Sequence, residues 1–116
     1  MKIEKSTMRV QYNEHMRGGE GTVTLLHLQE GDALPPHCRL HAQITVPAGA
    51  SIGYHVHENE MEVFHFLAGC GHVDDNGTMV PVQAGDVIAT PSGCGHAVYA
   101  DAGVDLTMDA VINLNE

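Results

Sequence analysis

Short runs of alternating hydrophobic and polar residues follow one another along the chain, separated by Gly, Pro, Asn and Asp. The clearest run is RLHAQITV at residues 39–46, in which every second residue is apolar. Successive side chains of a strand point to opposite faces, so this run predicts a strand with one face in a core. No stretch shows the period of a long helix.

Several further strands follow from the same pattern, and they are expected at residues 22–28, 62–68, 78–82, 87–90 and 104–112. Asn76-Gly77 predicts a tight hairpin, because both central positions of a type I′ turn need positive φ. Strands this short indicate a sandwich or barrel rather than alternating strands and helices. We therefore expect one all-β domain over residues 1–116, with residues 1–20 as an N-terminal arm or edge strand.

The charge balance limits the choice of partners. Fifteen Asp and Glu residues against five Lys and Arg give a formal net charge of −10. This excess repels phosphate backbones and anionic lipids, so neither nucleic acid nor a membrane is expected as a partner. The sequence has no apolar run of transmembrane length and no apolar stretch of the signal-peptide kind, which predicts a cytoplasmic protein.

The three cysteines, Cys38, Cys70 and Cys94, have no CxxC spacing. An odd number of cysteines argues against a disulfide framework and indicates reduced thiols. Cys70, next to a glycine, is expected to be a small buried residue, and Cys94 a turn residue rather than a metal ligand.

Two of the nine histidines, His55 and His57, stand out because they are two residues apart and are followed by Glu62. On a strand both imidazoles would point the same way, and a turn in the polar segment Glu58-Asn59-Glu60 would bring Glu62 back beside them. Two neutral nitrogens and one carboxylate suit a first-row transition metal better than Mg or Ca. His96 is available as a fourth ligand. Taken alone, a His-x-His pair favours a polar surface hairpin over a metal site.

The residues around this pair resemble the first signature motif of the cupin family. Gly49 is followed after five residues by His55, and one residue later comes His57. Glu62 follows after four further residues and Gly69 after six more. These spacings agree with the family motif at every position.

A second segment is similar to the second cupin motif. Gly85 is followed after five residues by Pro91, then after one residue by Gly93, and after two more by His96. The family often has Asn at the end of this motif, where this chain has Ala100, a position that is usually structural. Residues 49–100 therefore carry both motifs in order.

The resemblance implies a double-stranded β-helix, or jelly-roll barrel, with one divalent metal ion inside. The implied ligands are His55, His57, Glu62 and His96, with one or two positions left open, and the ion is Mn, Fe, Ni, Co, Cu or Zn. Phe64 and Phe66 share the face of Glu62, so they are expected either to line the cavity or to pack in the core.

For the remaining polar residues the sequence predicts only which side of the barrel they face. Arg39, His41 and Gln43 form a row that either faces the barrel, where it could hold a substrate carboxylate, or faces outward, which an unpaired Arg would favour. Surface or interface positions are expected for His65 and His72. Glu60 could replace Glu62 as the carboxylate ligand, but the motif spacing favours Glu62.

The chain as a whole resembles small bacterial cupins of the oxalate-decarboxylase-like group. Those decarboxylases have a substrate-binding Arg three residues before the first metal histidine, whereas this chain has Ile52 there. Two hypotheses follow. One is a metal-dependent enzyme of decarboxylase, oxidoreductase or dioxygenase type acting on a small carboxylate or a similar oxygen-bearing small molecule. The sequence does not identify its catalytic residues. The other is a non-catalytic binding or sensing protein. The family also implies a homodimer.

Overall fold

The computed structural model describes residues 1–115, which form ten strands and three short 3₁₀ turns. The strands are β1 (Val10–Glu14), β2 (Thr22–Gln29), β3 (Cys38–Val46), β4 (Ser51–Val56), β5 (Glu60–Ala68), β6 (Cys70–Asp75), β7 (Thr78–Gln83), β8 (Val87–Thr90), β9 (Gly95–Ala100) and β10 (Leu106–Leu114). The turns are η1 (Lys5–Thr7), η2 (Met16–Gly18) and η3 (Gly31–Ala33).

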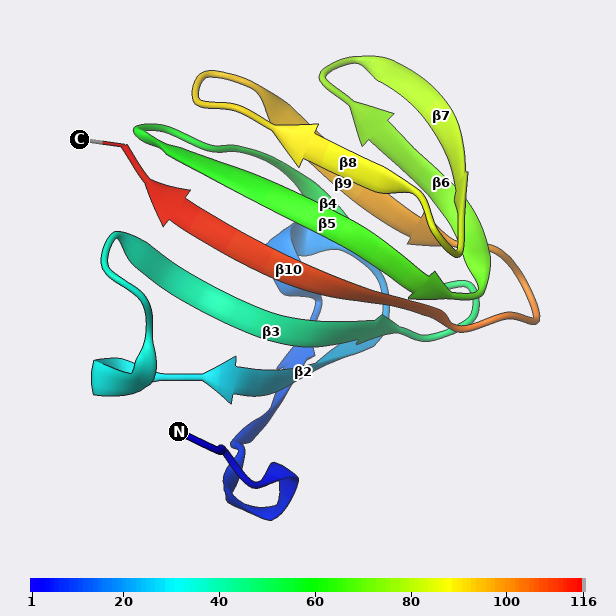
Figure 1. Ribbon diagram of the computed structural model, residues 1–116. Helices are drawn as coiled ribbons and strands as arrows, with labels where there is room; N and C mark the ends of the chain where they lie inside the picture. Colours follow the sequence, from blue (N-terminus) through cyan, green and yellow to red (C-terminus); the bar gives the residue numbers. More distant parts are fainter. Residues whose placement is uncertain (116) are drawn as a thin grey trace.

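The strands form two antiparallel sheets that face each other, as Figure 1 shows. The larger sheet has six strands in the order β1-β2-β3-β10-β5-β8, and the smaller has four in the order β4-β9-β6-β7. From β3 onward the chain passes from one sheet to the other at every connection except that between β6 and β7, which form a hairpin within the smaller sheet. This is the predicted jelly-roll barrel.

The strands predicted from alternation are present, with ends that differ by two residues at most. The strand expected at 62–68 begins earlier, at Glu60, and the one expected at 104–112 runs from Leu106 to Leu114. The hairpin prediction is confirmed, because Asn76 and Gly77 have φ values of 50° and 97°. Asp75 pairs with Thr78 on either side of this two-residue turn.

Apolar side chains from both sheets meet between the layers and form one core. Ile44 and Met108 come from paired strands of the larger sheet, and Val73 and Val98 from paired strands of the smaller one. Each of the four is at most 1% exposed. Burial of such side chains contributes about 1.5–3 kcal/mol each and holds the layers together.

The segment that contains η2 connects β1 to β2 of the larger sheet and packs against β4 of the smaller sheet (Figure 1). Backbone meets backbone there: a Cβ on Gly53 would collide with the carbonyl of Arg17, and a Cβ on Gly19 with the carbonyl of Ser51. Only glycine permits this approach. The segment from Met16 to Gly19 is thereby fixed beside the strand that carries His55.

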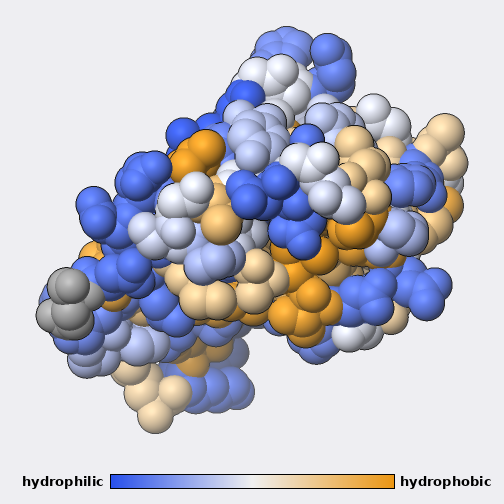
Figure 2. All heavy atoms as spheres, turned by 90° about the horizontal axis from the view of Figure 1, so that it is seen from above, coloured by the Kyte–Doolittle hydropathy of each residue, from blue (hydrophilic) through white to orange (hydrophobic). Residues whose placement is uncertain are grey.

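The surface is mixed in character. Figure 2 shows hydrophobic side chains reaching the surface in places between hydrophilic ones. The exposed large apolar residues include Tyr12, Tyr54, Met79 and Val87. Within residues 1–115, no helix has the length and apolar character needed to span a membrane.

Candidate metal centre

The four residues singled out by the motifs come together between the two sheets. His55 on β4 lies directly opposite His96 on β9 in the register of the smaller sheet. His57 follows β4 by one residue, and its backbone is tied to the turn before β9 by a 3.0 Å hydrogen bond from its N–H to the carbonyl of Cys94. Glu62 reaches the same point from β5 in the larger sheet.

The donor atoms of this group converge tightly. The Nε2 atom of His96 lies 3.1 Å from Nε2 of His55 and 3.2 Å from Nε2 of His57. Oε1 of Glu62 is 3.0 Å from Nε2 of both His57 and His96. All four donor atoms lie within 4.8 Å of one another. Metal–ligand bonds of about 2.0–2.2 Å at right angles place two donors about 3 Å apart, so this spacing fits one ion at the centre.

The other ring nitrogen of each histidine is held from outside the cluster. Nδ1 of His55 donates to the carbonyl of Gly53 at 2.8 Å, and Nδ1 of His57 donates to the carboxylate of Glu60 at 2.6 Å. Nδ1 of His96 lies 2.8 Å from the hydroxyl of Thr90. A proton on Nδ1 leaves the Nε2 lone pair free, which is how ligating histidines are oriented.

This arrangement requires something positive at its centre. Nε2 lone pairs of neutral imidazoles that face one another at about 3 Å, beside a carboxylate, repel each other unless a proton or a metal ion lies between them. His57, Glu62 and His96 are each 5% exposed or less, so water does not relieve the repulsion. The donor set therefore fits a divalent cation.

The pKa values of His55, His57 and Glu62 indicate where a proton is held in the cluster when no metal ion is bound. Burial lowers the pKa of His55 to about 4, which keeps that ring neutral. The hydrogen bond to Glu62 raises the pKa of His57 above its usual value. Burial would raise the pKa of Glu62, but the hydrogen bonds to His57 and His96 lower it. A proton shared by these residues competes with a metal ion for the same donors.

A second layer of charge supports His57. The guanidinium of Arg39 makes two 2.7 Å hydrogen bonds to the two carboxylate oxygens of Glu60. These bonds lower the pKa of Glu60 to about 2, so it remains an acceptor for His57. Glu60 therefore orients the ring of His57, and Glu62 faces the centre of the cluster. The sequence proposed Glu60 only as a substitute ligand and did not identify its pairing with Arg39.

A small pocket of about 100 Å³ borders the cluster, with His55, His57 and Glu62 in its lining. Ile52 and Phe64 line it, and Phe64 stacks on His96 with ring centroids 4.8 Å apart. Phe66 lies behind, fully buried against Phe64. Of the two phenylalanines expected to line the cavity or pack in the core, Phe64 therefore does the former and Phe66 the latter. Two cationic side chains, Arg17 and Arg39, also line the pocket.

The other singled-out polar residues lie away from the cluster. In the polar row on β3, only Arg39 reaches the pocket, while His41 bonds the side chain of Gln29. His65 and His72 are exposed, as expected. Cys70 is half-buried rather than buried, because it lies at the edge of a second pocket.

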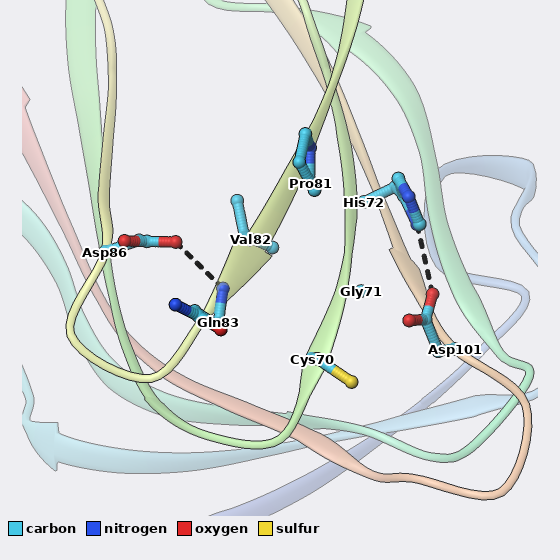
Figure 3. A pocket seen from close by; sticks show the side chains of 8 residues that line it. All are labelled: Cys70, Gly71, His72, Pro81, Val82, Gln83, Asp86 and Asp101. Atoms are coloured by element: carbon cyan, nitrogen blue, oxygen red, sulfur yellow. Dashed lines mark hydrogen bonds and ion pairs between the residues drawn. The ribbon is translucent and has the colours of Figure 1, made fainter.

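This second pocket, of about 330 Å³, lies between β6 and β7 (Figure 3). His72 and Asp101 form a pair on one side of it, with 3.0 Å between Nδ1 and Oδ1, and Cys70 points toward Asp101. Partial burial, with the nearby Asp101 carboxylate, raises the pKa of the Cys70 thiol, so it stays protonated near neutral pH. Of the described residues, only the four in the barrel converge as a possible metal-binding group.

A jelly-roll barrel that encloses three converging histidines and a glutamate is typical of metal-binding barrel proteins, and sequence comparison assigns this chain to one family of them. Residues 42–112 match the cupin domain family, and the chain belongs to that family. It is 40% identical to the oxalate-binding protein of Thermotoga maritima over 114 residues, which cover 98% of this chain and 94% of the relative.

Solved structures extend the same likeness. The crystal structure of a predicted oxalate decarboxylase from Thermotoga maritima is 39% identical, with a TM-score of 0.92 over 98% of this chain and 99% of the other. A polyketide cyclase from Streptomyces resistomycificus has a TM-score of 0.77 at 19% identity, over 100% of this chain and 80% of its own. At that identity the cyclase shows only the shared fold.

Proposed function

We propose that this chain binds one divalent transition metal ion through His55, His57, Glu62 and His96 and presents it to a small carboxylate. The observation that carries the proposal is the convergence of four donor atoms whose partners leave their lone pairs pointing at one place. Four protein ligands on a six-coordinate ion leave two positions for a ligand. The candidate ions are Mn, Fe, Co, Ni, Cu and Zn, since imidazole nitrogen suits all of them.

The pocket above the donors favours a short anion. About 100 Å³ corresponds to roughly three water molecules, which is far below the volume of pockets for drug-sized ligands. Apart from the donors, its lining is apolar except for Arg17 and Arg39, so the charge it offers a ligand is positive. A relative that is 40% identical is named an oxalate-binding protein, and oxalate matches this size and charge.

Metal content tests the ligand assignment. His57→Ala should lose stoichiometric metal in elemental analysis of protein dialysed against metal-free buffer. His65→Ala, which changes an exposed histidine of β5, serves as the matched control and should retain one ion per chain. Equal metal content in the two variants would show that the assignment is wrong.

Binding without turnover is the form of the function that the pocket supports best. Besides His55, His57 and Glu62, its lining offers no histidine, aspartate or glutamate that could act as a general acid or base. The alternative is a metal-dependent decarboxylase, oxidoreductase or dioxygenase, which the likeness to a predicted oxalate decarboxylase favours. Release of CO₂ or uptake of O₂ by the metal-loaded protein with oxalate would establish the enzyme. Binding of oxalate with neither would establish the binding protein.

We further propose a cytoplasmic homodimer of single cupin domains. Support for the dimer comes from β1, which ends the larger sheet and exposes Val10 and Tyr12 at 46% and 73%. An open, partly apolar edge strand favours pairing with a second copy. Light scattering on the eluting protein tests this, and a monomer mass at micromolar concentration would contradict it.

A further inference from the structure

The two arginines of the metal pocket differ in what holds them. Arg39 is engaged by both carboxylate oxygens of Glu60. Arg17 is exposed, and within residues 1–115 its side chain has no acidic partner. A positive charge at a pocket mouth without an internal counter-ion is available to an incoming anion.

Arg17 is also fixed in place by its backbone. It adopts a left-handed conformation with φ 55°, and His15 before it and Gly18 after it have φ values of 52° and 82°. Left-handed backbone is uncommon at residues other than glycine and persists where surrounding contacts enforce it. The chain at Arg17 is therefore held in a conformation that it would not adopt alone.

The contacts that enforce this conformation come from within the turn and from β4. The N–H of Gly18 donates to the carbonyl of His15 at 2.9 Å, and Nδ1 of His15 bonds the carbonyl of Gly19 at 3.1 Å. The N–H of Glu20 donates to the hydroxyl of Ser51 at 2.9 Å. Gly53, whose missing side chain admits the carbonyl of Arg17, is also the residue whose carbonyl holds His55. One glycine thus positions both a metal ligand and the arginine beside it.

The side chain of Arg17 lines the same pocket as His55 and Glu62. Ile52, next to Gly53 on β4, is buried in the pocket and supplies no charge. The unpaired cation of this pocket therefore comes from the turn before β2.

From this geometry we infer that Arg17 is the specificity-determining residue of the pocket and binds the second carboxylate of a short dicarboxylate whose first carboxylate lies at the metal. The inference rests on the proposed function. The planar guanidinium offers two parallel N–H donors to one carboxylate, which an ammonium group does not. A dianion would thus be preferred over a monocarboxylate of the same length.

Calorimetric titration of the Co²⁺-loaded protein with oxalate and with glycolate tests this inference. Glycolate has the same two-carbon skeleton but one carboxylate. The wild-type protein should prefer oxalate, and Arg17→Gln should reduce that preference at least about tenfold, as expected for a lost charge-assisted hydrogen bond. Arg17→Lys should give an intermediate loss. Arg9→Gln, which removes a charge that Glu30 already pairs, is the matched control and should leave the preference unchanged.

Metal content and melting temperature distinguish failure of the role proposed for Arg17 from failure of the carboxylate proposal. Metal content and melting temperature of Arg17→Gln should equal those of the wild type, because Arg17 is neither a ligand nor part of the core. With metal content equal, an unchanged preference for oxalate in Arg17→Gln would overturn the role of Arg17 and leave the metal proposal standing. Failure of the metal-loaded wild-type protein to bind oxalate would overturn the carboxylate proposal, and the role of Arg17 with it.

Discussion

The barrel pocket and the pocket between β6 and β7 place histidines beside carboxylates in opposite ways. In the barrel, His55, His57 and Glu62 line a pocket of about 100 Å³, and His96, which meets them, is fully buried. In the other pocket, of about 330 Å³, the side chains of His72 and Asp101 are 48% and 40% exposed. The larger pocket therefore holds one exposed ion pair, whereas the smaller one borders four converging donor residues.

The difference lies in what constrains the side chains. Each barrel histidine has its outer nitrogen held by a carbonyl, a carboxylate or a hydroxyl group, so its inner nitrogen can point only one way. The Nδ1 atom of His72 instead bonds Asp101, and this pair lies at the surface. An exposed pair of this kind contributes about 0–1 kcal/mol and holds no fixed geometry. Convergence of oriented donors, more than volume, identifies the site.

The largest expected difference between the two pockets is the effect on metal content of replacing His96 or His72. His96→Ala should abolish stoichiometric metal binding, because it removes a ligand that touches both His55 and Glu62 across the cluster. His72→Ala should keep one ion per chain. Elemental analysis after dialysis gives the reading, and circular dichroism checks that both variants are folded. Loss of metal from the His72 variant would reverse the assignment of the two pockets.

Metal removal should destabilise the barrel. A ligand that binds only the folded state at a hundredfold excess over its Kd stabilises that state by about 2.7 kcal/mol. For a chain of this size, a chelator should lower the melting temperature by roughly 10 °C. The same chelator should leave His96→Ala unchanged, since that variant has no ion to lose. Identical melting curves of the wild-type protein with and without chelator would count against the buried site.

A smaller effect is expected at the residue that orients His57. Glu60→Gln keeps the shape of the side chain but removes the charge that Arg39 and His57 share. Metal affinity should fall by about 10–100-fold, while saturating metal still fills one site. Competition with a chromophoric chelator measures this change. If Glu60→Gln instead lost all metal at saturation, Glu60 would be a ligand rather than a support.

The smallest effect is predicted in the second pocket. Asp101→Asn removes the charge that faces His72 but keeps a group able to accept a hydrogen bond. Unfolding free energy should change by no more than about 0.5 kcal/mol, as for most surface substitutions. Denaturant titration measures it, and metal content should not change. A loss of several kcal/mol would mean that this pair matters structurally far more than its exposure indicates.

The strands could be predicted from the sequence because alternation reports directly which face is buried. The strand at Val87–Thr90 was predicted with its exact bounds, and Asn76-Gly77 located a hairpin through turn chemistry alone. Strand ends were less certain at Glu60, where polar residues suited to a turn already pair with β10. The four proposed ligands could be named because the motifs fix their spacing.

The surroundings of the site could not be predicted in the same way. The link from Arg39 to Glu60 joins residues 21 apart, and Arg17 reaches the pocket only because Gly53 admits its backbone. Neither contact leaves a periodic signal, since the first depends on how β3 and β5 are placed in the larger sheet and the second on how η2 packs against β4. Glu60 and Glu62 also alternate to the same side of β5, so only the structure shows that one faces a ring from outside and the other the centre.

The position of the ion tests the central claim most directly. Crystals of Mn-loaded protein, measured at an X-ray energy just above the Mn absorption edge, should show one anomalous peak per chain. It should lie about 2.0–2.3 Å from Nε2 of His55, His57 and His96 and from an oxygen of Glu62. No peak between these atoms, or one beside His72 and Asp101 instead, would contradict the account.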